Sequence, residues 1–454
     1  MLRRLSIALL LAGCTSAASG TFDGGSCAAA DCAALPAPTL IEAHAGNGFL
    51  LARWTQGAAN VTGYTVVAAP ASGTPQVFHT AETSLLATGL ENGTAYSVTV
   101  AAVVAGGTGP SSAAISVTPA ATCARSFALH RTYATLASPG MVAMGDFDQD
   151  GFLDVAVTQA GGVGVFMNDR TGTLLPRTDR ALSATPTSLV SADFNFDGLF
   201  DLAAGGAATS VLYSDGGVVD IGGSSSMLAA ADVNLDGVPD LVLGGTTPQV
   251  ALDDGDGGFG PAQLIPGAAA ATLIAAGNFD TDGLASLAVA SPGAASFQVL
   301  GNPGDGGVFV TPVSYPLSAA PLWIAAGDFD GDGLVDLAFP AANGQILIHP
   351  QQAVDGGFGV ETQVASGTLP AFLAAVDVDL DNLDDLVYTA PSQNRLGVLL
   401  HGADGGFAAP LLFPTGGAPA SVAAGDLNGD GLPDLVVANS ADNTVSVFIN
   451  VCAQ

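Results

Sequence analysis

A nine-residue acidic segment recurs seven times along this 454-residue chain, and it constrains the fold more than any other feature. A clear copy is DFDGDGLVD at residues 328–336. The copies begin at Asp146, Asp193, Asp232, Asn278, Asp328, Asp377 and Asp426, so successive copies start 39 to 50 residues apart. A period of this length is typical of one four-stranded blade of a β-propeller. Seven copies therefore predict seven blades.

The residues around each acidic segment support this interpretation. A strand of small apolar residues precedes each copy, such as MVAMG before Asp146 and WIAAG before Asp328. Ala and Gly suit the innermost strand of a blade, where the blades converge and space for side chains is limited. A second and a third strand follow, as in DLAF and GQILIHP, and most units then carry an Asp-Gly-Gly hairpin turn. We predict an all-β, seven-bladed propeller over residues 123–454.

The N-terminal residues have the features of an export signal. Two arginines precede the apolar run LSIALLLA, which is too short to cross a bilayer, so we expect residues 1–13 to be a cleaved signal peptide. The motif LAGC, which ends at Cys14, resembles the lipobox of bacterial lipoproteins. This resemblance implies a lipid on Cys14, and Thr15 after it implies the outer membrane. The alternative is an ordinary secretory signal with a buried Cys14.

Residues 14–35 are small and rich in Gly and Ala, and we interpret them as a flexible tether in which Cys27 and Cys32 form a local disulfide. Residues 36–120 change to alternating strands such as FLLARWTQ and VTGYTVVAA. This segment resembles the fibronectin type III module. The resemblance implies a β-sandwich in which Trp54 is the core tryptophan and Tyr96 is the corner tyrosine that caps nearby backbone.

The two ends of the propeller segment are complementary. NTVSVFINV at residues 443–451 is a third strand with no fourth strand after it, and SFALHRTYATL at residues 126–136 is an extra strand before the first repeat. We expect the two to pair, because closure of the ring removes exposed strand edges. Cys123 and Cys452 flank the gap that remains. We predict a disulfide between them; the alternative, two unpaired thiols, is disfavoured in an oxidising compartment.

The chemistry of the repeated segment points to a hard cation. Oxygens at positions 1, 3, 5 and 9 converge, Gly at position 6 permits a sharp bend, and position 7 offers a carbonyl, which together suit calcium. No His or Cys occurs in any copy, so zinc is a poor candidate. An EF-hand would need Glu at position 12, which in the fifth copy is Phe339, and a following helix.

The predicted calcium ligands are Asp146, Asp148, Asp150 and Asp154; Asp193, Asn195, Asp197 and Asp201; Asp232, Asn234, Asp236 and Asp240; Asp280 and Asp282; Asp328, Asp330, Asp332 and Asp336; Asp377, Asp379, Asp381 and Asp385; and Asp426, Asn428, Asp430 and Asp434. These make up to seven sites. The fourth, at residues 278–286, has Asn278 and Ser286 in place of two Asp, so we expect it to bind most weakly. The alternative is a set of hydrated acidic turns, which seven copies in one register disfavour.

Across residues 125–454 the chain resembles the FG-GAP/VCBS repeats of integrin α-type propellers, on the strength of all seven copies. The resemblance implies calcium in the loops, an extracellular or surface location, and recognition more often than catalysis. We expect calcium to be mainly structural.

Charge and composition limit the classes of partner that the protein can bind. The formal net charge is −32, with nine arginines and no lysine, which excludes a nucleic-acid role because phosphate binding depends on cationic side chains. The five histidines are scattered, and no nucleophile elbow, P-loop or CxxC motif occurs. We therefore expect no catalytic site and no enzyme.

The predicted function is that of a monomeric, lipid-anchored protein of the cell envelope that recognises a protein or polysaccharide. One alternative is a carbohydrate-active enzyme, a polysaccharide lyase or hydrolase. Another is a structural part of an envelope assembly.

Overall fold

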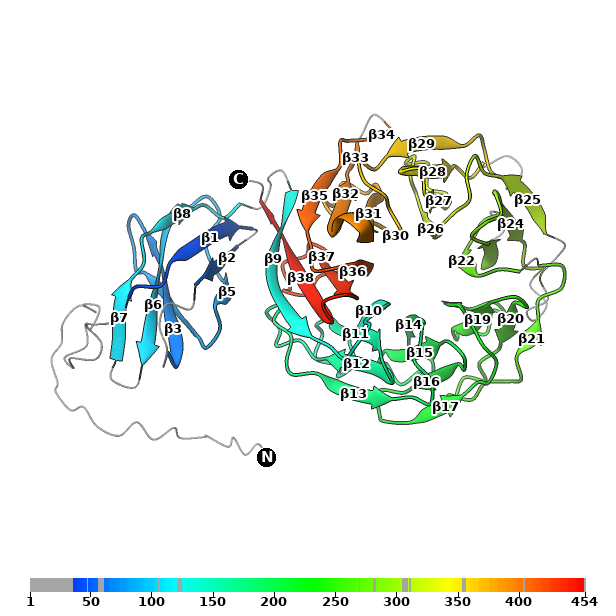
Figure 1. Ribbon diagram of the computed structural model, residues 1–454, viewed down its shortest axis with the longest axis horizontal. Helices are drawn as coiled ribbons and strands as arrows, with labels where there is room; N and C mark the ends of the chain where they lie inside the picture. Colours follow the sequence, from blue (N-terminus) through cyan, green and yellow to red (C-terminus); the bar gives the residue numbers. More distant parts are fainter. Residues whose placement is uncertain are drawn as a thin grey trace.

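The computed structural model describes residues 36–452, except 47, 56–60, 105–106, 121–124, 269, 281–282, 304–308, 310–311, 353–356, 403–404 and the side chain of residue 452. These residues form strands and one 3-10 turn, η1 (Pro391–Gln393), with no α-helix among them. The predicted fold class is confirmed: a β-sandwich precedes seven four-stranded sheets arranged in a ring (Figure 1).

The predicted signal peptide and tether, with Cys14, Cys27 and Cys32, lie outside the described residues. Among the residues that are described, no helix has the length and apolar character needed to cross a membrane.

The sandwich consists of two antiparallel sheets. Its strands are β1 (Leu40–Ala45), β2 (Phe49–Trp54), β3 (Gly63–Pro70), β4 (Gln76–Thr80), β5 (Ser84–Thr88), β6 (Tyr96–Val104), β7 (Gly107–Ser111) and β8 (Ile115–Val117). One sheet has the order β1-β2-β5 and the other β4-β3-β6-β7, with β8 also paired to β6. Trp54 and Tyr64 pack edge to face at 5.3 Å in the core. The Tyr96 hydroxyl accepts a hydrogen bond from the Glu91 N–H at 3.1 Å, which is the predicted corner contact.

Each of the first six blades is one antiparallel sheet whose strands follow in chain order from the axis outward. Blades 1 to 3 consist of β10 (Val142–Gly145), β11 (Asp154–Gln159), β12 (Gly162–Phe166) and β13 (Thr178–Ala181); β14 (Ser188–Ala192), β15 (Asp201–Gly205), β16 (Ser210–Leu212) and β17 (Val218–Asp220); and β18 (Met227–Ala231), β19 (Asp240–Gly244), β20 (Gln249–Ala251) and β21 (Gln263–Leu264).

Blades 4 to 6 consist of β22 (Leu273–Gly277), β23 (Ser286–Ala290), β24 (Ser296–Leu300) and β25 (Val313–Pro316); β26 (Ala325–Gly327), β27 (Asp336–Pro340), β28 (Gln345–His349) and β29 (Thr362–Ala365); and β30 (Phe372–Val376), β31 (Asp385–Ala390), β32 (Arg395–Leu399) and β35 (Leu411–Pro414). Blade 6 also carries a small hairpin of β33 (His401–Gly402) and β34 (Gly406–Phe407).

The burial of the strands explains their sequence patterns. Every residue of β11, β15, β19, β23, β27, β31 and β37 (Asp434–Asn439) is buried, because neighbouring blades cover both faces of the second strand. The sequences of these strands are therefore largely continuous apolar runs, without an alternation of apolar and polar residues. Outer strands such as β13 and β29 are largely exposed and polar.

Blade 7 closes the ring with strands from both ends of the propeller segment. Its order is β36 (Pro419–Gly425), β37, β38 (Thr444–Cys452) and β9 (Arg125–Ala134), so the predicted pairing of the last strand with the first is confirmed. Cys452 is the register partner of Arg125, which follows Cys123 by two residues in the sequence. Cys123 itself lies outside the described residues, so the disulfide stays a prediction.

The sandwich packs against this closing seam (Figure 1). Phe49, Leu51 and Leu86 are buried in one apolar cluster with residues of β9, β37 and β38. An ion pair of 3.8 Å between Arg131 and Glu82 adds a polar contact at the same boundary. The sandwich is thus in direct contact with the propeller, beside the strands that close it.

Candidate cation-binding loops

Each acidic segment forms the loop between the first and second strand of a blade. We call these loops 1 to 7 and number their positions 1 to 9. The loop always joins the innermost strand to its neighbour in the same direction, so all seven lie on one face of the ring.

Positions 1 and 6 together shape the turn. In six loops the carboxylate at position 1 accepts a hydrogen bond of 2.8–3.0 Å from the backbone N–H at position 6. The backbone at position 6 is left-handed in all seven, with φ between 67° and 91°. Gly adopts this conformation without cost, and Asn382 in loop 6 is one of the few other residue types that tolerates it.

The Asp at position 9 has a structural role that the sequence did not reveal. In the six loops that have it, one oxygen accepts the N–H of position 2 and the other accepts an N–H near the end of the third strand, at 2.7–3.1 Å. These carboxylates are buried. Position 9 therefore fastens the loop to two strands of its own blade.

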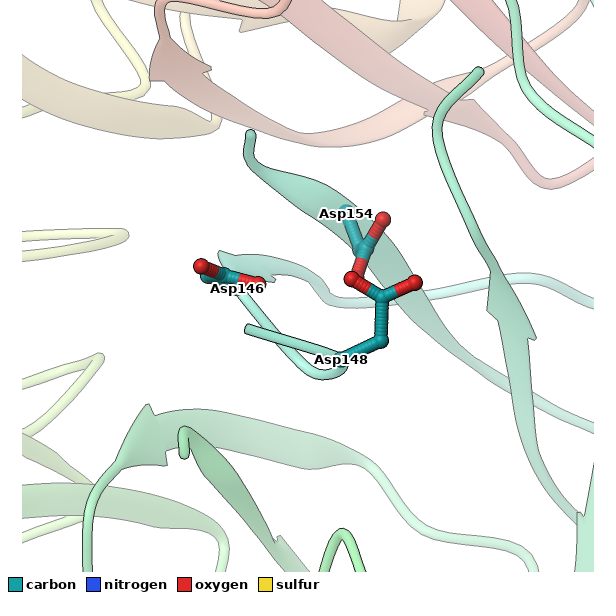
Figure 2. Close-up of side chains that lie close together, drawn as sticks. All are labelled: Asp146, Asp148 and Asp154. Atoms are coloured by element: carbon teal, nitrogen blue, oxygen red, sulfur yellow. The ribbon is translucent and has the colours of Figure 1, made fainter. Parts of the chain in front are cut away.

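Three loops bring three carboxylates together. The sets are Asp146, Asp148 and Asp154; Asp328, Asp330 and Asp332; and Asp377, Asp379 and Asp385, each with one oxygen per residue within 4.8 Å of the others. Figure 2 shows the first set, in which the carboxylates of Asp148 and Asp154 face one another and Asp146 lies beside them. Such close approach of like charges is unfavourable unless a cation lies between them.

Two of the three loops with Asn at position 3 are arranged differently. In loops 2 and 3 the amide nitrogens of Asn195 and Asn234 donate to the position-5 carboxylates of Asp197 and Asp236, at 3.0 and 2.8 Å. These pairs relieve part of the local repulsion without a cation. A cation at the same place would need the amide oxygen instead of the nitrogen.

Loop 4 lacks the interactions of position 9. Ser286 replaces Asp there, and its buried hydroxyl has no hydrogen-bond partner in the part of the chain that the structure describes. Asp282 lies outside the described residues. The expectation that this loop binds a cation most weakly stays a prediction.

Loop 1 contains a cation of its own. The Arg170 Nε lies 2.8 Å from the Asp150 Oδ2 at position 5, and this hydrogen bond lowers the pKa of the Asp150 carboxyl. Arg170 comes from the turn after β12 and has a left-handed backbone with φ of 70°. An arginine therefore occupies a predicted calcium ligand in one of the loops with the most carboxylates.

The pKa values of the position-9 carboxyls are raised above the ordinary value for Asp. Burial raises the pKa of Asp154, Asp201 and Asp240 to about 6 and that of Asp336 and Asp385 to about 7, although two backbone N–H bonds oppose the shift. Burial also raises the pKa of Asp434 well above its usual range. The ionised forms of these groups are thus poorly solvated by the protein alone.

The donor set fits a calcium ion. Asp379 Oδ1 and Asp430 Oδ2 are buried oxygens without a hydrogen-bond partner among the described residues, at positions 3 and 5 of loops 6 and 7. Both oxygens are hard ligands of the type that calcium prefers. A bound cation would supply the interaction that each of them lacks. Calcium would neutralise the loop, and this chain's carboxylates would hold it.

A second set of residues links neighbouring loops. Asn168, at the end of the third strand of blade 1, donates to the Leu153 carbonyl of loop 1 at 3.0 Å and to the Leu427 carbonyl of loop 7 at 2.7 Å. Asn302 and Asn450 make the equivalent pair of bonds in blades 4 and 7. The recurrence of Asn after VFM, VLG and VFI was the only sequence signal for them.

The fold and these loops define a β-propeller protein with acidic, strand-connecting loops and an N-terminal β-sandwich. The family model of the FG-GAP-like repeat matches residues 146–204, 278–339 and 377–450. The model of the fibronectin type III domain matches residues 36–118. The chain thus carries FG-GAP-like repeats and a fibronectin type III domain, as predicted.

One solved structure agrees on the fold, and two others show weaker similarity. BBS1N, from its crystal structure in complex with ARL6DN, is similar with a TM-score of 0.53 at 10% identity, over 72% of this chain and 97% of that chain. An Agrocybe aegerita lectin that recognises non-reducing terminal N-acetylglucosamine has a TM-score of 0.46 at 16% identity, over 78% and 90%. The FN5 domain of Drosophila Lar has a TM-score of 0.18 at 26% identity, over 19% and 99%. No curated protein matches the chain.

Proposed function

We propose that this protein is a calcium-stabilised recognition protein of the cell envelope, anchored by a lipid on Cys14, that binds a protein or glycan through its propeller. The FG-GAP-like repeats and the fibronectin type III domain support the coarser class, a recognition or adhesion protein of the β-propeller type. The finer statement depends on calcium and on the anchor.

The proposal of bound calcium rests on one observation. In each of three loops, three carboxylates have oxygens that lie within 4.8 Å of one another. At these distances the carboxylates repel one another, most strongly in the sets that include the buried Asp154 and Asp385. A dication bound there offsets the repulsion and fixes the ends of the first two strands of a blade. Calcium acts here as a structural ion, and recognition belongs to surfaces that the loops hold in place.

Calcium binding is tested by titration of the full chain after chelation. We expect binding of three or more ions, because three loops have the carboxylate sets and the other four loops have two or three Asp at the ligand positions. Triple replacement of Asp328, Asp330 and Asp332 by Asn should remove at least one ion. Binding of no calcium by the folded wild-type chain contradicts the proposal.

The anchor and the class of activity need separate experiments. Metabolic labelling with a fatty-acid analogue should label the wild-type protein and leave Cys14→Ser unlabelled. Incubation with a panel of polysaccharides should give no cleavage products. Turnover of any of them would favour the alternative, a carbohydrate-active enzyme.

A further inference from the structure

A cavity of about 620 Å³ lies between blades 5 and 6, on the side of loop 5. Phe329 and Asp330 of loop 5, the outer strand β29 and residues 405–410 after the blade 6 hairpin turn line it. Its volume is in the range of sites that bind small molecules or single side chains. It adjoins the cation position, because Asp330 and Asp336, two of the predicted calcium ligands of loop 5, are among its lining residues.

Apolar side chains form one part of the cavity wall, and Thr362 and Gln363 of β29 add polar groups to it. The rings of Phe329 and Phe407 stand 6.4 Å apart with an angle of 55° between them, and Ile348, Pro350 and Pro410 continue the same surface. No Lys or Arg lines it, so an anionic ligand would meet no compensating charge. The walls suit an aliphatic chain, which gains by leaving water.

One end of the cavity is negative. Asp330 is exposed there, and Asp328 and Asp332 have oxygens within 4.8 Å of its carboxylate. Loop 5 has four carboxylates, so a bound dication would reduce its charge from −4 to −2 and leave it negative. The chain as a whole carries −32, which draws cationic partners toward it.

We propose that this cavity binds a primary amine or guanidinium group on an aliphatic stem, as in a lysine or arginine side chain of a partner protein. The stem lies along the apolar walls, as long basic side chains do on other apolar surfaces. The cationic head meets the Asp330 carboxylate in a charge-assisted hydrogen bond, next to the faces of two phenyl rings. This inference rests on the proposed recognition function and names the chemistry of its ligand.

The first test uses the wild-type full chain in calcium buffer and needs no variant. Calorimetry compares 1,5-diaminopentane with 1,5-pentanediol, which has the same stem without the charges. We expect the diol to bind at least about tenfold more weakly, because a hydrogen bond between charged groups contributes that much or more. Equal binding of the two probes would overturn the proposal.

The second test uses matched charge removals. Asp330→Asn should weaken diamine binding by about tenfold or more, and Phe407→Ala should weaken it as well. Asp220→Asn removes one charge from β17, far along the chain from this cavity, and should change binding less than about twofold. Equal losses in Asp330→Asn and Asp220→Asn would mean that only the overall charge attracts the amine, which contradicts a built site.

The third test distinguishes two possible sources of the amine, a side chain of a partner protein and a free small molecule. An acetylated peptide with one central lysine should bind at least as tightly as the diamine. If it binds more than about tenfold more weakly, the assignment to a protein side chain is wrong and a free amine is the ligand. Calcium titration of the same samples is read independently, so a failure of calcium binding and a failure of amine binding are distinguishable.

Discussion

Asp336 and its equivalents show how one residue type serves two purposes in these loops. The carboxylate at position 9 accepts two backbone N–H groups and is buried, while the carboxylates at positions 3 and 5 remain available to a cation. The position-9 residues therefore shape the loop, and two of them, Asp154 and Asp385, also belong to the carboxylate sets that could hold a cation. This division explains why Asp at position 9 is not interchangeable with a surface acid.

The raised pKa values of the position-9 carboxyls predict a pH dependence. A carboxyl with a folded-state pKa of about 6 to 7 binds more protons in the folded chain than in the unfolded chain, where its pKa is about 4. The free energy of unfolding of the calcium-free protein should thus fall as pH rises from about 4 to about 7. In EDTA, the urea midpoint at pH 5 should exceed that at pH 7.5. An equal or higher midpoint at pH 7.5 would contradict this prediction.

Arg170 predicts a difference in affinity between loops. Calcium must displace its guanidinium from Asp150 to use that ligand, and an exposed ion pair of this kind contributes about 0.2–1 kcal/mol. Arg170→Gln should therefore raise the calcium affinity of one site by up to about fivefold, measured by calorimetry. Arg180→Gln, which removes an arginine that bonds to the Tyr213 carbonyl, is the control and should leave the affinity unchanged. A reduced affinity in Arg170→Gln would show that the arginine assists binding.

The sequence predicted positions 1 and 6 of each loop because both depend on residues within the loop itself. It did not predict Arg170, which reaches Asp150 only because the pairing of β11 with β12 brings the chain back past loop 1. Nor did it predict that Gln149, Phe196, Leu235 and Leu380 at position 4 have positive φ. These residue types disfavour that conformation, so only the surrounding fold imposes it.

At the scale of the strands, the ends of the third strands hold adjacent blades together. The Asn450 amide donates to the Val378 carbonyl of loop 6 and to the Pro433 carbonyl of loop 7, at 2.8 and 3.2 Å. Both bonds are inside the protein, where an unsatisfied carbonyl is costly. The link between blades 6 and 7 thus depends on one side chain near the end of the third strand, β38.

Replacement of the Asn450 side chain should lower the stability of the fold. Asn450→Ala leaves two carbonyls without their donor and should lower the free energy of unfolding by about 1–3 kcal/mol, measured by urea denaturation. Asn343→Ala on the exposed turn before β28 removes an amide that accepts only one backbone N–H, and it should cost less than half as much. Equal losses of stability in the two variants would mean that the hydrogen bonds between blades contribute no more than a hydrogen bond in an exposed turn.

The order of the strands was predictable, whereas some of their details were not. Small apolar strands before each loop and apolar runs after it predicted the first and second strands, and the unpaired ends of the segment predicted closure by β9 and β38. The Asp-Gly-Gly turn between β33 and β34 was predicted as a hairpin turn, but these two-residue strands were not, because they carry no periodic signal. The role of Asn450 depends on its neighbour blade, which a single repeat does not contain.

At the scale of the whole molecule, the sandwich is more than a spacer between the tether and the propeller. Phe49, Leu51 and Leu86 are buried against the strands that close the ring. The sequence placed these residues of β2 and β5 in strands. It contained no signal for the surface that they cover. The sandwich therefore covers the one blade that is made from two ends of the propeller segment.

The predicted disulfide acts at the same seam. A bond between Cys123 and Cys452 would join the ends of β9 and β38 and should stabilise the fold by about 2–5 kcal/mol through the long loop that it closes. Non-reducing peptide mapping should find the two cysteines in one linked fragment. Cys123→Ser should lower the melting temperature, and free thiols at both positions in protein isolated without reductant would contradict the prediction.

The central claim is that calcium holds the blades of this propeller in place. The most direct measurement is the melting temperature of the full chain at pH 7.5 in excess calcium and in excess EDTA. We predict a markedly lower melting temperature in EDTA, restored by calcium and not by magnesium, because the loops have hard oxygen ligands in a flexible arrangement. The same melting temperature in calcium and in EDTA would contradict the claim.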